Sequence, residues 1–343
     1  MVLKWNIAEG ALSNKTQTLP EITPVQATPS PPTAHHAHPT PIPFIDKISV
    51  IFELPTEQDA YETHLAIWGD GGAFKDKDAF VDVKGGKWGP FRAAKKIALP
   101  SIPDLKKCPL FQYGYEDHKA GKMRLEFVPV DLGSKGLVEL HGVLLTIIDG
   151  RWSHIVKHGR ITRLDIAVDF PDVMIDDFQF LALQGATTKE WRVDGKLTGY
   201  THGKPKGNHT AIYDRKVKRI AQKKPWQGKE GMRVERRIKA PPIEKLTELA
   251  NLPNPFSAMC LTSMPEAPPA KSKTMLYVWD LFKQAVQVQG LTAALALLPE
   301  ERRTLYRKHL DDHKQPWWNP DAIWQGWPIM LDELKIGSPT AWL

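Results

Sequence analysis

The sequence predicts an α+β fold, with a mixed or antiparallel β-sheet domain and flanking helices followed by a mostly helical C-terminal region. Segments of alternating apolar and polar residues recur between residues 44 and 249, separated by single segments with helical spacing of their apolar residues. Strands mixed with single helices are typical of an α+β sheet domain. From residue 250 onward the apolar residues mostly follow helical spacing.

The first predicted strand, residues 44–54, places Ile45, Ile48, Val50 and Phe52 in the core. Further strands are predicted at residues 121–130, 160–170, 208–217 and 231–240, and a glycine-rich stretch at 68–89 predicts loops or a hairpin. Helices are predicted at 55–68, 136–150, 173–185, 274–290 and 299–310. The tryptophan-rich segment 316–328 is expected to cover the sheet domain or to close a helical subdomain.

Three regions follow from these patterns: a leader at residues 1–43, a sheet domain at 44–249 and a helical region at 250–343. Eight prolines lie between Leu19 and Pro43, so the leader cannot build a core and is expected to be extended or disordered. The hydrophobic fraction of 42% is that of an ordinary globular protein. No apolar run approaches a membrane span and no apolar signal core is present, which predicts a cytoplasmic protein without a membrane partner.

Charge is unevenly distributed along the chain, whose net charge is +7. The segment from Lys196 to Lys239 holds fourteen Lys and Arg residues against three acids, a local net charge of +11. Such a basic segment in an otherwise mildly acidic chain indicates a specific anionic partner. A solvated, lysine-rich surface is the alternative explanation.

The predicted strand at residues 160–170, RITRLDIAVDF, contains two acidic residues, which are uncommon in a half-buried strand. Leu164, Ile166 and Val168 alternate on one face, so Arg163, Asp165 and Asp169 share the other. Glu126, Asp165 and Glu235 lie on the polar sides of three predicted strands. If those sides converge, the three carboxylates could hold Mg²⁺ or Mn²⁺. Asp165 and Asp169 could instead simply neutralise neighbouring basic side chains.

A second pattern, Tyr-x-x-Lys, lies within the basic segment. Taken as one strand, HTAIYDRK puts Tyr213 and Arg215 on one face, with Lys216 close behind. A phenol can attack a phosphate while an ammonium stabilises the developing charge. In RVERRIK, Arg233 and Arg237 flank Glu235 and offer two phosphate-binding forks. A strand tyrosine is also often structural, and that alternative stays open.

The order of these motifs resembles the replication initiation factor family of rolling-circle plasmids and filamentous phages. The resemblance covers residues 44–249 and is most specific in TRLDIAVDF, followed by IYDRK and RVERR. Members of that family nick one DNA strand at an origin and stay attached through a phosphotyrosine, leaving a free 3′-hydroxyl as a primer. The resemblance implies that Tyr213 is the nucleophile, Asp165 a metal-site acid and Lys216 the partner of the phosphate.

The family resemblance also implies that the partner is origin DNA, as a single strand or an extruded hairpin. A host helicase and polymerase would act after the nick. Within the basic segment the expected DNA-binding residues are Lys204, Lys206, Arg233, Arg236 and Arg237. The oligomeric state stays open, with a homodimer as one alternative. A non-catalytic DNA-binding protein on the same scaffold, such as a repressor or a degenerate initiator, is the main alternative function.

The histidines depart from a pattern common among rolling-circle nucleases, a His-hydrophobic-His pair on a strand. The only similar motif is His36-Ala37-His38, which lies in the proline-rich leader without a strand around it. It is therefore rejected as a catalytic metal site. His209 shares the predicted strand face of Tyr213 and is a further candidate ligand.

Overall fold

The α+β fold predicted from the sequence is confirmed by the computed structural model, in which ten of the described strands form one antiparallel sheet. The structure describes residues 41–68, 80–83, 91–115, 122–147, 152–182, 188–194, 196–204, 206–223, 225–226, 228–269, 273–315 and 317–337. The leader, with its His36 and His38, and most of the glycine-rich stretch lie outside these residues.

The order of strands across the sheet is β2-β3-β4-β5-β1-β6-β11-β10-β9-β8, so β1, β6, β11 and β10 lie side by side at its centre. The strands are β1 (Phe44–Glu53), β2 (Phe80–Asp82), β3 (Phe91–Ile97), β4 (Leu110–Tyr115), β5 (Lys122–Phe127), β6 (Arg160–Pro171), β8 (Thr188–Val193), β9 (Lys196–Gly203), β10 (His209–Asp214) and β11 (Gly231–Lys239). Two further short strands, β7 (Gln179–Ala182) and β12 (Met259–Thr262), pair with each other.

The helices are α1 (Glu57–Trp68), α2 (Pro129–Ile147), α3 (Trp152–His158), α4 (Arg215–Ala221), α5 (Lys273–Gln289), α6 (Leu291–Ala296), α7 (Glu300–Asp312), α8 (Pro320–Trp324) and α9 (Trp327–Leu334). Two short 3₁₀ helices are η1 (Ile175–Asp177) and η2 (Leu246–Asn251). In the described part of the chain, no helix combines the length and the apolar character that crossing a membrane requires.

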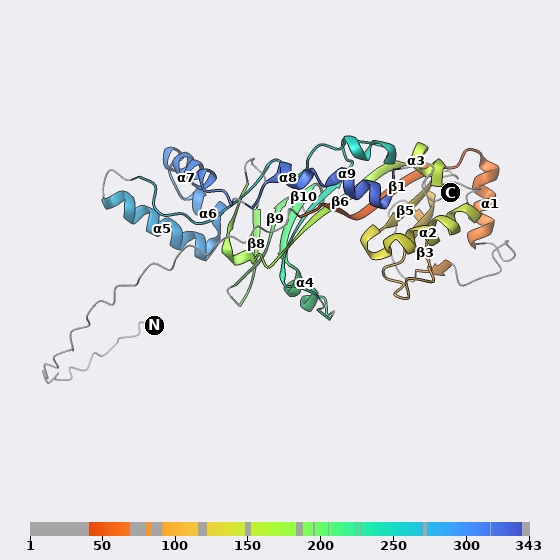
Figure 1. Ribbon diagram of the computed structural model, residues 1–343, viewed down its shortest axis with the longest axis horizontal. Helices are drawn as coiled ribbons and strands as arrows, with labels where there is room; N and C mark the ends of the chain where they lie inside the picture. The colour runs from red at the N-terminus through yellow and green to blue at the C-terminus, as the bar shows by residue number, and fades with distance from the viewer. Residues whose placement is uncertain are drawn as a thin grey trace, which may run out of the picture. The chain divides into compact units, whose positions relative to one another are not determined.

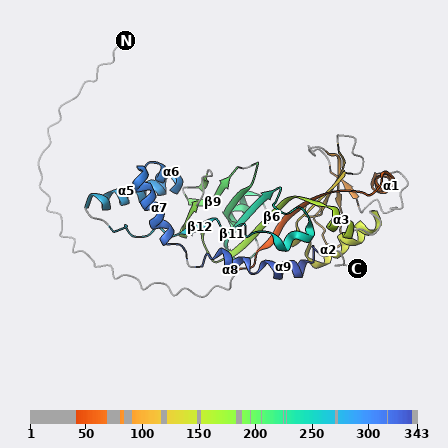
Figure 2. The same ribbon diagram turned by 90° about the horizontal axis from the view of Figure 1, so that it is seen from above.

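One face of the long sheet is apolar and is covered by helices. Ile48, Val50, Leu164, Ile166 and Val234 are buried there, in one cluster with side chains of α2, α3, α8 and α9. Figure 2 shows α2, α8 and α9 along one side of the sheet, and in Figure 1 α8 and α9 lie above the central strands while α4 projects below them. Because side chains alternate along a strand, the charged residues of the central strands collect on the face away from this core.

The tryptophan-rich segment covers the sheet, which is one of the two roles expected from the sequence. Trp318 donates its indole N–H to the carbonyl oxygen of Met259 at 3.0 Å, and Trp327 donates to that of Leu249 at 2.8 Å. The rings of Trp324 and Trp327 stack with centroids 4.7 Å apart. Each buried indole thus satisfies its single donor while its ring fills the core.

Trp327→Ala is expected to lower the free energy of unfolding by about 3–5 kcal/mol, because it leaves a large cavity and an unpaired carbonyl group. Ile329→Ala is the matched control, since Ile329 lies in the same helix but is 54% exposed. It should change the free energy of unfolding by less than about 1 kcal/mol. Urea denaturation of both variants measures the difference, and equal losses would contradict the packing role of Trp327.

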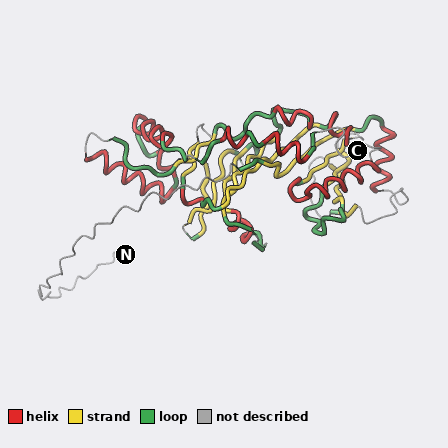
Figure 3. Tube along the Cα trace, viewed as in Figure 1, coloured by secondary structure: helices red, strands yellow, loops and turns green. Residues whose placement is uncertain are grey.

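The C-terminal helices contribute to two separate apolar clusters. Helices α8 and α9 join the main core, whereas α5, α6 and α7 form a second cluster that includes Trp279, Phe282, Tyr306 and Leu310. Figure 3 shows these three helices as one group, in red. The C-terminal region is mostly helical, as predicted, but its strand β12 was not predicted.

Two predicted elements differ from the structure. Residues 173–185 were expected to be helical, but their described part, residues 173–182, contains η1 and β7, because Phe180 and Leu181 are buried on opposite sides in the two apolar clusters. The strand expected at 208–217 ends at Asp214. The carboxylate of Asp214 accepts the backbone N–H of Val217 at 2.9 Å and so begins helix α4.

Candidate active site

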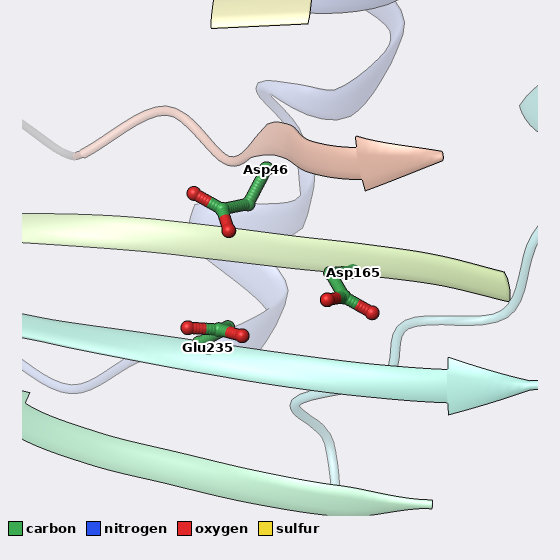
Figure 4. Close-up of side chains that lie close together, drawn as sticks. All are labelled: Asp46, Asp165 and Glu235. Carbon is green, nitrogen blue, oxygen red and sulfur yellow. The ribbon is translucent and has the colours of Figure 1, made fainter. Parts of the chain in front are cut away.

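Three carboxylates meet on the charged face of the three central strands. Asp46 comes from β1, Asp165 from β6 and Glu235 from β11, and one oxygen of each lies within 4.8 Å of the others. Figure 4 shows the three side chains gathered between these strands. Asp165 and Glu235 are almost fully buried, so their charges are compensated within the protein rather than by water.

A β-bulge in β1 brings Asp46 to this face. The pairing of β1 with β6 shifts between Ile45 and Lys47, and Lys47 lies opposite Asp165. Ile45 and Ile48 are both fully buried although they are three residues apart. Strict alternation would put Asp46 on the core side together with Ile48, and the extra residue of the bulge turns it outward.

Tyr213 lies beside the acid cluster, on β10. Its hydroxyl donates a hydrogen bond to Oε2 of Glu235 at 3.0 Å. Register places Tyr213 opposite Arg233 and places Ala211 opposite Glu235, so the tyrosine and the acid are diagonal neighbours on the same face. Burial, together with the negative charge of Glu235, raises the pKa of Tyr213 above its ordinary value. The resting phenol is therefore neutral, with its proton directed at a carboxylate.

Basic side chains surround the carboxylates. Nε of Arg163 contacts Oδ1 of Asp165 at 2.9 Å, and Arg237 bridges Asp165 and Glu235 at 3.2 and 3.3 Å. Arg233 contacts Asp46 at 2.8 Å and Asp169 at 2.6 Å. The three carboxylates are thus each paired with, and positioned by, planar guanidinium groups.

Lys218 lies against the tyrosine. Its Nζ is 3.6 Å from the centroid of the Tyr213 ring and 3.6 Å from Oε2 of Glu235. The first turn of α4 places it there, because that helix starts immediately after β10. A cation in this position favours negative charge on the phenol oxygen as that charge develops.

The pKa values of Asp46 and Glu235 are shifted in opposite directions. Burial, and then the charge of Glu235, raise the pKa of Asp46 above its ordinary value despite its contact with Arg233. Burial alone would also raise the pKa of Glu235, but Lys218 and the hydrogen bond from Tyr213 outweigh it and hold that pKa low. An additional positive charge would therefore be more favourable beside Asp46 than beside Glu235.

The donor set suits a hard divalent cation. All three side chains offer carboxylate oxygens, the ligand type that Mg²⁺ and Mn²⁺ prefer, and no histidine or thiol is among them. Asp46, Asp165 and Glu235 could hold such an ion on the face that carries Tyr213.

The structure brings together Asp165, Glu235 and Tyr213 from the predicted site, together with Arg233 and Arg237. It places Lys216 elsewhere: this lysine is exposed on α4 and pairs with Glu230. Arg215 contacts Asp169 at 3.4 Å and lies over the ring of Trp226. Lys218 occupies the position against Tyr213 that the sequence assigned to Lys216.

Glu126 is also outside the acid cluster. It accepts a hydrogen bond from Lys47 at 2.9 Å, on the same face of the sheet. Arg236 points to the opposite face, where it donates to the hydroxyl of Thr210 at 3.1 Å. The residues before and after it on β11, Glu235 and Arg237, point to the other face of the sheet and lie at the cluster. These two residues remain predictions as a metal ligand and a DNA contact.

The turn between β9 and β10 holds the remaining predicted residues. Lys204 and Lys206 are exposed there, and the carbonyl oxygen of Lys206 accepts a hydrogen bond from Nζ of Lys239 at 2.6 Å. His209 is buried, with Nδ1 at 3.2 Å from the carbonyl oxygen of Gly207, and is not a member of the acid cluster.

Sequence reasoning missed Asp46 and Lys218. The spacing of Ile45 and Ile48 was a usable signal, because two core residues three apart in a strand require a bulge. For Lys218 the signal was Asp214, a favourable N-cap residue directly after the tyrosine, which starts a helix in place of a continued strand.

No protein-family model matches the chain, and no curated protein matches it. Among solved structures, the chain is similar to a rolling circle replication initiator protein from Geobacillus stearothermophilus. The identity is 16%, the TM-score is 0.38, and the match covers 73% of this chain and 98% of that one. A likeness at that TM-score and identity decides neither the fold nor the function of this chain.

Proposed function

We propose that the chain initiates rolling-circle replication by nicking one DNA strand at an origin through transesterification by Tyr213. The observation that carries the proposal is the hydroxyl of Tyr213, which is hydrogen-bonded to Glu235 of an all-oxygen acid cluster. A tyrosine beside three carboxylates and several guanidinium groups combines a nucleophile, a base and phosphate-binding donors. The family resemblance of the motifs that hold these residues points in the same direction.

In the proposed step, the oxygen of Tyr213 attacks a phosphodiester phosphorus, and the bond from phosphorus to the 3′ oxygen breaks. The phenol proton passes to Glu235, and the departing 3′ oxygen takes up a proton from water. The products are a 5′-phosphotyrosine and a strand with a free 3′-hydroxyl. One phosphodiester replaces another, so the step needs no external energy source.

The proton transfer from Tyr213 to Glu235 runs uphill, because the pKa of the phenol is raised and that of the carboxyl is lowered. Lys218 offsets part of this cost from its position against the ring. A Mg²⁺ or Mn²⁺ ion held by Asp46, Asp165 and Glu235 would polarise the scissile phosphate. Arg237 and Arg163 contact the carboxylate of Asp165 at 3.2 and 2.9 Å and hold it in place.

The test is incubation of the chain with labelled single-stranded oligonucleotides that tile the replicon encoding it, with and without Mg²⁺. Separation on a denaturing protein gel then shows whether label travels with the protein. The proposal predicts a covalent adduct on one segment of the replicon that requires the metal. If all of the label migrates as free DNA for every segment, both with and without Mg²⁺, the result counts against the proposal.

The contacts of the carboxylates favour a second candidate, a DNA-binding protein without catalysis. Asp46 and Asp165 each contact a guanidinium group, and Glu235 contacts Arg237 and Lys218. A network of this kind also stabilises a sheet without any metal. This candidate predicts salt-sensitive binding of origin DNA that is independent of metal and yields no adduct.

Lys218→Ala is expected to slow nicking by about tenfold or more, because it removes the cation that lies against the attacking phenol. Lys216→Ala is the matched control on the same helix, and its ammonium pairs with Glu230 away from the tyrosine. That variant should stay within about twofold of the wild-type rate. Single-turnover nicking of an origin oligonucleotide measures both rates, and a greater loss in Lys216→Ala would restore the role first assigned to Lys216.

A further inference from the structure

A cavity with apolar and basic lining residues lies at the end of strands β1, β5 and β6, away from the acid cluster. Its volume is about 530 Å³, and its lining includes Ile51, Pro55, Lys122, His154, His158 and Arg160. These residues come from the C-terminal end of β1, the N-terminal ends of β5 and β6, and helix α3. A cavity of this size is large enough for a nucleotide-sized ligand.

The lining combines flat rings with cations. The imidazole rings of His154 and His158 lie with centroids 4.7 Å apart, and Nε2 of His154 is fixed at 2.7 Å from the carbonyl oxygen of Glu53. Lys122 contacts Glu53 at 3.1 Å. Arg160 is exposed and has no ion-pair partner among the residues that the structure describes. Rings beside an available guanidinium group suit a base and a phosphate together.

The cavity and the acid cluster share strand β6: Ile51 and Arg160 line the cavity from the charged face of the sheet, whereas His154 and His158 reach it from α3, at the end of β6. Ile51 pairs with Arg160, and Ser49 pairs with Arg163. The register shift between Ser49 and Val50 adds one residue to β6 here, so the two arginines lie on the same side of the strand although they are three residues apart. Asp165 follows Arg163 on that side and belongs to the acid cluster. The β1 partners of Arg160 and Asp165, Ile51 and Lys47, are four positions apart, so the arginine and aspartate positions lie roughly 13 Å apart along the strand. Arg163 stands between the two sites.

We infer that this cavity binds a nucleotide of the same single strand whose phosphate lies at Tyr213. The strand runs along the charged face of β6 past Arg163, and one base enters beside His154 and His158. Its phosphate is held by Arg160 and Lys122. The inference rests on the proposed function for its substrate class, and it adds a subsite that fixes which stretch of the strand reaches the tyrosine.

The test uses fluorescence anisotropy with the full chain carrying Tyr213→Phe, labelled single-stranded oligonucleotides and Mg²⁺, so that binding is measured without cleavage. Arg160→Gln should weaken binding about fivefold at 0.1 M salt and lower the salt slope by about 0.7. His158→Ala should weaken binding about tenfold through the lost stacking. Lys157→Gln is the matched control, because Lys157 is an exposed neighbour on α3 outside the cavity, and it should change affinity less than about twofold.

A length series adds a second readout. Shortening the oligonucleotide one residue at a time should produce a sharp loss of affinity when it no longer reaches the cavity, and Arg160→Gln should lack this step. Thymidine monophosphate is the free-nucleotide probe and should compete only weakly. Competition as strong as that of the oligonucleotide would overturn the assignment to a DNA strand.

The outcomes separate the two proposals. If Arg160→Gln and His158→Ala melt like wild type and bind like Lys157→Gln, the cavity inference is wrong, while an adduct on wild type would still support nicking. If the length step exists but wild type never forms an adduct, nicking is wrong and the subsite stands. If the full chain binds no single-stranded DNA, both are wrong.

Discussion

Tyr213→Phe is expected to abolish every covalent adduct between the chain and DNA, a loss of about a thousandfold or more in nicking. The substitution keeps the ring under Lys218 and removes only the hydroxyl that donates to Glu235. Glu235 retains its contacts with Arg237 and Lys218, so the fold and the affinity for DNA should survive. Label retained by protein on a denaturing gel measures the adduct, and anisotropy measures binding.

Tyr200→Phe is the matched control for this prediction. Tyr200 is a buried tyrosine of the neighbouring strand β9, and its hydroxyl lies 3.4 Å from the carbonyl oxygen of Phe178. It should form the adduct at the wild-type rate. If label persists on Tyr213→Phe and disappears from Tyr200→Phe, the nucleophile has been misassigned.

Asp46→Asn is expected to lower metal-dependent nicking by at least about 100-fold, because it removes a charged oxygen ligand from the cluster. Its effect on stability should have the opposite sign. The folded state raises the pKa of Asp46, so folding disfavours its ionised form at neutral pH. Without a divalent ion, Asp46→Asn should therefore melt at the same temperature as wild type or higher. Adding Mg²⁺ should raise the melting temperature of wild type but not that of Asp46→Asn.

Glu126→Gln tests which residues bind the metal. The sequence predicts Glu126 as a ligand together with Asp165 and Glu235, whereas the structure places Asp46 there instead. Burial would raise the pKa of Glu126, but Lys47 outweighs it and holds that pKa low. Its ionised form is thus stabilised by folding, and this stability is lost as pH falls through the low pKa. Glu126→Gln should melt slightly lower than wild type and keep its response to Mg²⁺. Loss of that response in Glu126→Gln, with Asp46→Asn unaffected, would favour the original ligand set.

Regular alternation made part of this site predictable. The faces of residues 160–170 and 231–239 could be read from the sequence, because Leu164, Ile166 and Val234 alternate with the charged residues. Each of these strands continues past the cluster in regular pairing with the other. Asp165, Glu235 and Arg237 consequently lie close together on one face of the sheet, as the alternation of apolar and charged residues predicted.

The parts that could not be predicted depend on local irregularities. A bulge added Asp46, and a helix start after Asp214 exchanged Lys216 for Lys218. The choice of partner for Glu126 depended on Lys47, which lies opposite Asp165 on the charged face. A shift of one residue changes the face of a strand residue, so periodicity alone cannot decide such positions.

Mass spectrometry of the peptide that carries Tyr213 tests the central claim most directly. Wild-type chain is incubated with the tiled single-stranded oligonucleotides and Mg²⁺, digested with protease and nuclease, and searched for peptides with an added nucleotide 5′-phosphate. The account predicts this added mass on Tyr213, dependent on the metal and absent from Asp46→Asn. An added mass on any other residue, or no added mass on any segment of the replicon, would contradict it.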